Sequence, residues 1–413
     1  NRSVFYPNIS GSFIATEAFD FLRNKKNINY LKFRLGYSTA ANFPNPYSTR
    51  SALSISTRNF MTNAGTVINT NAIPNFLPNP NLKPELMAET ETGIEGKFFQ
   101  SRLSADITLY QRVSNDQILN RDLDPSTGYT SQQINAGKVT NKGVEAQLAY
   151  KIIRNKDWVW EVTGNWTINN SMVSDIPADL KEIVYAGYTT LGNFAINGQP
   201  LGIMKGYYYQ RHENGQLLVG AGGDYIASTT IGIIGNPNPN YRLSGINSLT
   251  YKSFTFRFQV DYTDGGDMYS STARSLLARG VTKDTEFDRA APYILPGVTA
   301  DGKPNNIQIS ATQGYFNNVF GPDQGGIFDA TVVRLRDMSL SYALPEKLLN
   351  KTPFGSVSIT ANGSNLWYYA PNFPKYMHFD PETNGLGVGN GKGLEFITGP
   401  SARRMGLSVR ITF

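Results

Sequence analysis

Strict alternation of apolar and polar residues constrains the fold of this chain more than any other feature. It is clearest in the final segment, where Met405, Leu407, Val409, Ile411 and Phe413 alternate with small or polar residues. Side chains of a β-strand point to opposite faces in turn, so this segment predicts a strand with one apolar and one polar face. We expect no later segment to cover the apolar face. We therefore expect that face to lie in apolar surroundings, and a lipid bilayer would provide them.

The same alternation predicts strands along the whole chain. In 254–264, apolar side chains at even positions oppose polar ones such as Arg257 and Asp261. In 330–344 the alternation shifts phase near Asp337, which predicts a β-bulge. The predicted strands are 4–16, 29–39, 87–98, 102–115, 137–150, 158–170, 241–251, 254–264, 330–344, 355–368 and 403–413. Roughly eleven strands of about 9–11 residues or more suit tilted crossings of a membrane.

The connections between these strands alternate strictly between short and long. The short ones are 17–28, 99–101, 151–157, 252–253 and 345–354. The long ones are 40–86, 116–136, 171–240, 265–329 and 369–402. Outer-membrane barrels combine short periplasmic turns with long extracellular loops, whereas a soluble sandwich has no reason to gather its long loops at one end. This regularity therefore predicts an all-β fold, a transmembrane antiparallel β-barrel.

Composition excludes several other classes of protein. Hydrophobic residues make up 40% and charged residues 17% of the 413 residues, and no stretch approaches the ~18 consecutive apolar residues of a membrane helix. The chain has no cysteine and two histidines, which argues against a disulfide scaffold and a structural zinc site. Its net charge of +6 is spread without a basic stripe, so we predict no nucleic-acid partner. We also predict no cofactor and no metal.

The predicted strand number is odd, although open sheet edges are not tolerated in hydrocarbon and bacterial barrels have even strand numbers. Either the alternation has missed some strands or residues 1–413 are part of a larger barrel domain with other strands outside this chain, and we favour the second interpretation.

Several motifs resemble those of a known family. They are NPNLKPE at 79–85, ETETGIE at 89–95, NAG at 135–137, NKGVE at 141–145, GQPLG at 198–202, GY at 206–207, GNPNPN at 235–240, VRLRDMSLSYALP at 333–345, NLW at 365–367 and FDPE at 379–382. The first four are similar to signatures of TonB-dependent outer-membrane receptors. The others resemble segments of the SusC-like transporters within that group, and together the motifs extend over most of the chain.

The resemblance implies a nutrient importer in the outer membrane of a bacterium of the Bacteroidetes group. Such importers are barrels of about 22 strands with an amino-terminal plug domain and a TonB box, and a SusD-like surface lipoprotein covers the extracellular mouth. By this resemblance the chain is the carboxyl-terminal half of the barrel, without the plug and the amino-terminal strands. The implied partners are the SusD-like lipoprotein, the TonB complex acting through the plug, outer-membrane lipid and the barrel-assembly machinery. Phe413 is the expected membrane-assembly signal.

Few residues suggest chemistry of their own. His378 with Asp380 and Glu382 has the residue types of a metal or acid–base site, but Pro381 favours an ordinary loop turn. The carboxylates Asp261, Asp264 and Asp267 suit a cation or sugar site, although a turn at a strand end is the simpler interpretation. No Ser–His–Asp arrangement stands out, so we predict no catalytic residues and no enzyme.

Aromatic side chains form two groups with different expected roles. Trp158, Trp160 and Trp166 share the predicted lipid face, where a membrane-interface girdle explains them. Four tyrosines in or beside the extracellular loops are candidate ligand contacts, because aromatic faces stack on sugars or pack against a lid protein. They are Tyr207, Tyr208, Tyr368 and Tyr369.

Three functions remain open at this point. The first is TonB-dependent import of an oligosaccharide or peptide, for which a polar lumen face suits a hydrated solute; this face includes Arg34, Arg257, Gln259, Asp261 and Arg410. The second is a structural role as a subunit of a larger outer-membrane assembly or secretion complex. The third is an outer-membrane enzyme, for which the loops provide no convergent set of catalytic residues.

Overall fold

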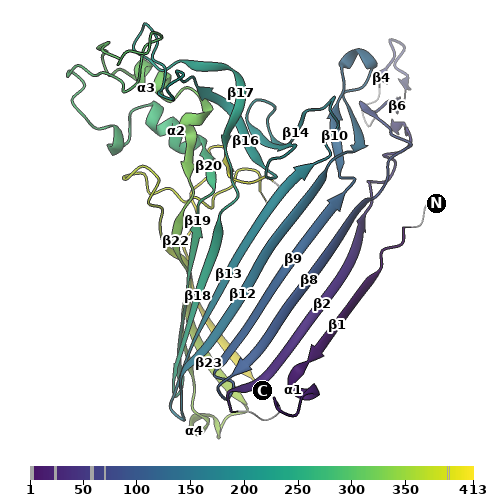
Figure 1. The fold of residues 1–413 in the computed structure, drawn as a ribbon, viewed down its shortest axis with the longest axis vertical. Coiled ribbons are helices and arrows are strands. Elements are labelled where there is room, and N and C mark those ends of the chain that lie inside the picture. The colour runs from purple at the N-terminus through teal and green to yellow at the C-terminus, as the bar shows by residue number, and fades with distance from the viewer. Residues whose placement is uncertain (1–3, 23–25, 56–59, 69–70, 388, 390) are drawn as a thin grey trace.

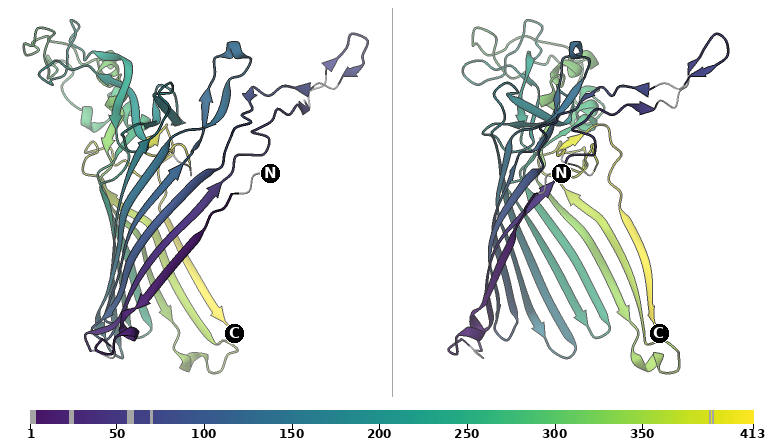
Figure 2. Two further views of the ribbon diagram at one scale, coloured as in Figure 1. Left: turned by 45° about the vertical axis from the view of Figure 1, so that its right-hand side comes forward. Right: turned by 90° about the vertical axis from the view of Figure 1, so that its right-hand side faces the viewer.

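The computed structural model describes residues 4–22, 26–55, 60–68, 71–387, 389 and 391–413 (Figure 1). Its main feature is a single antiparallel sheet of 11 strands that curves into a trough-shaped wall (Figure 2). None of the described helices is both long and apolar enough to cross a membrane.

The 11 strands follow one another in the sheet in the order of the sequence, so each strand pairs with the next one in the wall. They are β1 (Asn8–Ile14), β2 (Ile28–Asn42), β8 (Glu85–Phe98), β9 (Leu103–Asn115), β12 (Lys138–Arg154), β13 (Trp158–Ser174), β18 (Tyr241–Tyr251), β19 (Phe254–Asp264), β22 (Val332–Ala343), β23 (Ser356–Tyr369) and β25 (Arg404–Thr412). All predicted strands are confirmed. The largest boundary error is at the first, where 4–7 and 15–16 lie outside β1.

The predicted bulge is confirmed, and its extra residue is Arg336. Along β22, Asp337 pairs with Gln259 and Leu335 with Val260, so Arg336 has no partner of its own on β19. The same residue is skipped in the pairing with β23. Arg336 lies on the same side of the sheet as Arg334, where both contact carboxylates.

Register gives the wall one apolar and one polar face. A row of directly paired residues crosses ten strands and is apolar throughout: Phe13, Phe33, Ile94, Ile107, Ala146, Trp166, Leu243, Tyr262, Val333 and Tyr369. The adjacent row, on the opposite face, consists of small, polar or charged residues: Ser12, Arg34, Gly93, Thr108, Glu145, Thr167, Arg242 and Thr263. A sheet with these two faces suits a barrel wall between lipid and an aqueous lumen.

An aromatic row marks the short-turn end of the apolar face. Trp158, Tyr251, Phe254 and Tyr342 are paired across four neighbouring strands. The rings of Trp158 and Tyr251 lie 4.2 Å apart, and those of Phe254 and Tyr342 lie 4.5 Å apart. This row has the position of an interfacial girdle. Of the predicted girdle residues, Trp158 belongs to it, while Trp166 lies further along the lipid face.

Two glycines on the polar face let side chains cross a strand. The Arg34 guanidinium of β2 passes over Gly93 of β8 and reaches Asp106 of β9 at 2.5 Å. The Tyr110 ring passes over Gly143 of β12 and its hydroxyl lies 3.0 Å from Oδ1 of Asn169 on β13. A Cβ at either glycine would collide with the crossing side chain. Gly93 and Gly143 lie in the 89–95 and 141–145 motifs, so part of these motifs has a direct packing explanation.

The short connections lie at one end of the wall and the long loops at the other, as the sequence predicts (Figure 1). The short end carries α1 (Ala15–Ala18) and α4 (Glu346–Leu349). The long loops contain their own secondary structure, which the strand pattern did not predict. Their strands are β3 (Ser54–Ile55), β4 (Phe60–Met61), β5 (Val67–Ile68), β6 (Asn71–Ala72), β7 (Phe76–Leu77), β10 (Ile118–Asp122), β11 (Ser131–Asn135), β14 (Glu182–Gly187), β15 (Gly192–Ile196), β16 (Ile203–Tyr209), β17 (Ala227–Gly235), β20 (Asp267–Ser270), β21 (Ile327–Asp329) and β24 (Leu394–Glu395).

Most of the buried apolar side chains of the described residues lie near the long-loop end. Strands β14 to β17 form a four-stranded sheet, and β20 pairs with β21 and β24. The helices here are α2 (Ser271–Ala278) and α3 (Gln313–Val319), with short 3-10 helices η1 (Pro125–Thr127), η2 (Lys283–Thr285) and η3 (Asp323–Gly326). One buried cluster joins Met204, Ile234, Tyr269 and Leu394 from four segments. The loops therefore form a packed layer over the polar trough.

Candidate functional site

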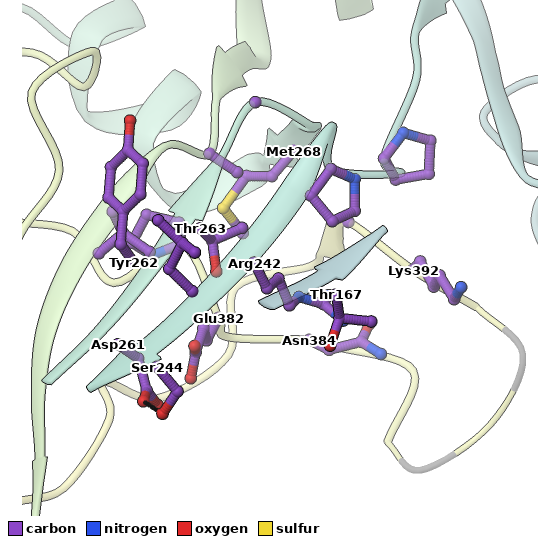
Figure 3. Close-up of a pocket in the computed structure, with 18 of the residues that line it drawn as sticks. Thr167, Arg242, Ser244, Asp261, Tyr262, Thr263, Met268, Glu382, Asn384 and Lys392 are labelled. Atoms are coloured by element: carbon purple, nitrogen blue, oxygen red, sulfur yellow. Dashed lines mark hydrogen bonds between the residues drawn. The ribbon is translucent and has the colours of Figure 1, made fainter. Parts of the chain in front are cut away.

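A cavity of about 680 Å³ lies where the polar face of the wall meets this loop layer (Figure 3). Its wall side is formed by β13, β18, β19 and β22, with Thr167, Arg242, Ser244 and Asp261 among the lining residues. Its other side is formed by loop residues around 237–239 and 265–268 and by residues 381, 382, 384, 389 and 391–393. We call residues 370–403, the connection between β23 and β25, the lumen strap.

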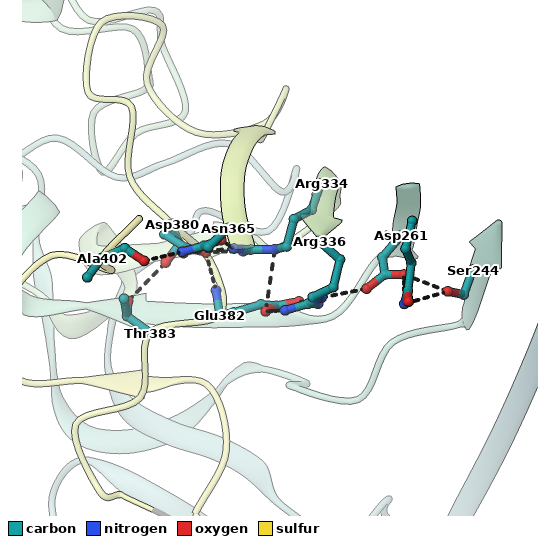
Figure 4. A network of polar contacts seen from close by, with 10 residues as sticks. Ser244, Asp261, Arg334, Arg336, Asn365, Asp380, Glu382, Thr383 and Ala402 are labelled. Carbon is teal, nitrogen blue, oxygen red and sulfur yellow. Dashed lines mark hydrogen bonds and ion pairs between the residues drawn. The ribbon is translucent and has the colours of Figure 1, made fainter. Parts of the chain in front are cut away.

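The lumen strap is held to the wall by a network of charged groups (Figure 4). Arg336 binds both oxygens of Glu382 in the strap at 2.7 and 2.8 Å, and its Nε donates to Asp261 of β19 at 2.6 Å. Asp261 also accepts from Ser244 at 2.6 Å and from Gln259 at 2.8 Å. One continuous chain of hydrogen bonds thus joins Glu382, Arg336, Asp261, Ser244 and Gln259.

At one end of this network lies a buried ion pair. Arg334 and Asp380 are 1% and 5% exposed. The two terminal guanidinium nitrogens of Arg334, Nη1 and Nη2, bind the two carboxylate oxygens of Asp380. Arg334 also binds Asn365, and its guanidinium lies 5.3 Å from the Tyr368 ring. Burial alone would raise the pKa of Asp380, but hydrogen bonds from Arg334 and Ser401 outweigh it and lower the pKa below its ordinary value.

A second anchor of the strap is the buried carboxylate of Glu395, which is 0% exposed. It accepts hydrogen bonds from the Ser270 hydroxyl, from the amide and hydroxyl of Thr272, and from the amide and hydroxyl of Thr398. Ser270 is the N-cap of α2, so the first turn of this helix surrounds the carboxylate. Burial would raise the pKa of Glu395, whereas these hydrogen bonds lower it overall.

A third anchor fixes the strap at the cavity edge. The fully buried side chain of Asn193 on β15 accepts from the backbone N–H of Lys392 at 2.9 Å and donates to its carbonyl at 3.0 Å. Gly393 follows with φ +65°, a left-handed conformation that favours glycine. The backbone of Lys392 is therefore held on both sides while its side chain lines the cavity.

The residues considered for metal or acid–base chemistry are engaged differently. Asp380 and Glu382 bind arginines of the wall, and the carbonyl of His378 accepts from the Tyr368 hydroxyl at 2.5 Å. Asp264 accepts from Asn240 and Tyr262, and Asp267 from the amide of Asn236. Burial raises the pKa of Asp267. Among the described residues, no group of three or more His, Cys, Asp or Glu side chains is placed to hold a metal ion.

The four tyrosines predicted as ligand contacts lie in two separate places. Tyr207 and Tyr208 belong to β16 in the loop layer, where Tyr207 is 37% exposed and Tyr208 packs against a buried cluster. Tyr368 and Tyr369 end β23, and Tyr368 faces the ion network while Tyr369, on the lipid side, is 57% exposed. Phe413 is 85% exposed and its ring contacts that of Phe354 at 5.5 Å.

Sequence reasoning missed the lumen strap and its three anchors. The Arg334–Asp380 pair joins residues 46 apart, and the Asn193–Lys392 pair joins residues 199 apart. One signal was available for the first: a bulged strand that presents two arginines to the lumen requires nearby carboxylates. Nothing in the local pattern indicates the other two.

The remainder of the lumen face is polar, and several of its charged side chains are paired with one another. Arg112 binds Glu89 at 2.9 Å, Lys32 lies 3.5 Å from Glu95, and Lys151 lies 3.8 Å from Glu161. A second hollow of about 560 Å³ is lined by such residues on β2, β8, β9, β12 and β13. Side chains of this kind accommodate water and hydrated solutes rather than an apolar ligand.

Comparisons with known proteins agree with this architecture. A family model described as "TonB dependent receptor-like, beta-barrel" matches residues 1–366. The chain is 25% identical to "TonB-dependent receptor P26" of Formosa agariphila over all of its own length and 43% of that protein. It is also 25% identical to "TonB-dependent receptor SusC" of Bacteroides thetaiotaomicron over 44% of this chain and 20% of that protein.

Solved structures share the fold. The wall and loops superpose on the RagAB peptide transporter with a TM-score of 0.71 at 20% identity, covering all of this chain and 44% of the other. The 'closed-closed' state of the RagAB peptide importer gives a TM-score of 0.73 at 19% identity. The chain thus spans less than half the length of the relatives it matches. With its lipid-facing wall, polar lumen and matching family model, the chain belongs to the TonB-dependent receptor-like β-barrels of the bacterial outer membrane.

Proposed function

We propose that this chain forms the carboxyl-terminal part of a TonB-dependent importer that carries a nutrient, an oligosaccharide or a peptide, across the outer membrane. The observation that carries the proposal is the cavity between the polar wall and the fixed lumen strap. A solute entering from the long-loop side would meet this cavity before it reached the polar trough.

The lumen is suited to hydrated solutes. Several of its charged side chains are paired with one another along the wall. The strap narrows the trough with backbone and polar side chains held in place by three anchors. A preorganised polar constriction of this kind favours recognition over free diffusion.

The energy source and the lid are further parts of the proposal. The family name points to TonB, which would act on a plug domain in the part of the receptor outside this chain. SusC-like relatives support a SusD-like lipoprotein over the loop layer as the partner. The RagAB transporter, which shares the fold, is named as a peptide transporter, and peptides therefore stand beside oligosaccharides as candidate solutes.

Among the four candidate tyrosines, Tyr207 is the best placed for a solute or a lid. Its side chain is more than one-third exposed on β16, while its amide is fixed by Asp323 at 3.0 Å. Tyr208 packs inward, Tyr368 is tied to the strap, and Tyr369 lies on the lipid side. We propose Tyr207 as a contact and the other three as supports of the surrounding structure.

The test is uptake by the full-length receptor. A strain lacking its gene is grown on a panel of single polysaccharides and protein digests, with and without an intact TonB system. Loss of growth on one substrate, restored by the receptor only when TonB is intact, supports import. Unchanged uptake of every substrate, together with stoichiometric co-purification of secretion or assembly proteins, would instead support a structural subunit.

A further inference from the structure

Within the cavity, two cationic side chains face the lumen without an acidic partner. Arg242 extends from β18 and Lys392 from the lumen strap, and both line the same cavity (Figure 3). Neither forms an ion pair or a side-chain hydrogen bond within the described part of the chain. The other arginine of this cavity, Arg336, is fully engaged by Asp261 and Glu382.

The acidic groups of the cavity do not neutralise this pair. Asp261 and Glu382 are both bound to Arg336, so their charges are already compensated. Asp267 accepts the backbone N–H of Asn236 at 2.7 Å, and burial raises its pKa. An excess of positive charge therefore remains at Arg242 and Lys392.

The surroundings of Arg242 and Lys392 indicate a binding site rather than two unrelated surface charges. The buried Asn193 binds both the N–H and the carbonyl of Lys392, so the Lys392 side chain extends from a fixed backbone position. Asn384 shapes the preceding turn by donating to the carbonyls of Gly387 and Gly391. Burial lowers the pKa of Lys392, and the positive charge of Arg242 lowers it further. An anion between them would relieve this repulsion.

We propose that Arg242 and Lys392 bind a carboxylate of the imported solute, so that the receptor selects acidic over neutral oligomers. The guanidinium supplies a fork of donors that matches a carboxylate, and the ammonium adds a point charge from the other side. Thr167 lies beside Arg242 on the adjacent strand and offers a neutral hydroxyl (Figure 3). This inference rests on the proposed function, and it adds the chemical class of the solute.

The source of the carboxylate is an acidic sugar or an acidic peptide, and two matched probe pairs distinguish them. One pair is tetragalacturonate and its methyl ester, and the other is end-capped tetraglutamate and tetraglutamine. Binding to the full-length receptor in outer-membrane vesicles is measured for the native protein and for R242Q, K392Q and K392R. Lys156, an exposed residue of the turn between β12 and β13, provides the matched control K156Q.

We expect one acidic probe to bind more tightly than its neutral counterpart, with affinity falling as salt rises. R242Q and K392Q should each weaken that probe roughly tenfold or more, because a hydrogen bond to a charged group is lost, while K392R and K156Q stay near the native affinity. Equal binding of acidic and neutral probes by the native receptor, or unchanged binding in both glutamine variants, would overturn the inference. Uptake of a neutral nutrient with TonB dependence would then still support import. If a glutamine variant fails to assemble, equal binding of acidic and neutral probes by the native receptor still overturns the inference.

Discussion

The buried pair between Arg334 and Asp380 gives the sharpest prediction about the lumen strap. In D380A, Arg334, which is 1% exposed in the native protein, would lose its bidentate carboxylate. Removing one partner of a buried ion pair costs about 3–5 kcal/mol, because the other charge is left uncompensated. The strap can relieve this cost by opening locally, since that would admit water to Arg334 without unpairing any wall strand.

The expected result is therefore local. A cost of about 3–5 kcal/mol multiplies the population of the open strap by roughly 10²- to 10⁴-fold. Hydrogen exchange at the amide of Lys392, which donates to Asn193, reports this opening. We expect its exchange to accelerate by that factor in D380A, while amides in the paired centre of β12 and β13 keep their native rates.

Two further variants separate charge from general disruption. D301A removes an exposed carboxylate that pairs with Lys303 in another loop, and it should leave strap exchange unchanged. The double variant R334M/D380L replaces both charges with apolar groups and should recover most of the protection, because a buried pair is often replaceable as a unit. If D380A exchanges within threefold of the native rate at Lys392, the pair does not hold the strap and the reasoning is wrong.

The remaining predictions concern the wall and its pH dependence. G143A should cost about 1–3 kcal/mol in unfolding experiments, because its Cβ would lie 2.5 Å from the backbone carbonyl of Ile168, whereas G93A should be close to neutral because the Arg34 side chain can move aside. L109R places a charge at the middle of β9 on the lipid face, where Leu109 is 50% exposed, and should cost about 2–4 kcal/mol in vesicles, against little for S104R on the lumen face. The pKa of Asp380 is lowered in the folded protein, so its contribution to strap docking is complete above the unfolded value of about 3.9 and is lost as the pH falls through the lower folded value. Strap exchange in the native protein, taken relative to the intrinsic amide rate, should thus accelerate below about pH 4, and this acceleration should be smaller in R334M/D380L.

Local patterns predicted the wall well because its determinants are local. The two-residue period determines which face of the sheet each side chain lies on. A one-residue slip in pairing would reverse the two faces, so the alternation pattern determines the register. The row from Phe13 to Tyr369 shows the result over ten strands. Membrane surroundings strengthen this relation, because each unpaired backbone group in hydrocarbon costs several kcal/mol.

The loop layer could not be predicted in the same way. Its strands are short, some of them only two residues long, and they pair with segments far away in sequence, as β20 does with β24. Loop closure over such distances depends on contacts that no periodicity records. Asn193 illustrates the limit, because a single amide in a loop strand gave no sign that it would hold Lys392.

The bulge at Arg336 connects what could be predicted with what could not. A regular strand would have placed Arg334 and Arg336 on the same face but moved every later residue of β22 out of phase with the lipid face. The extra residue keeps Met338 and Leu340 toward lipid while both arginines reach the lumen. One of these arginines is buried, and a buried guanidinium requires a carboxylate. The position of the bulge therefore determines where the strap lies. Asp380 and Glu382 bind the two arginines at the bulge. The rest of the strap, including Lys392, then lines the cavity.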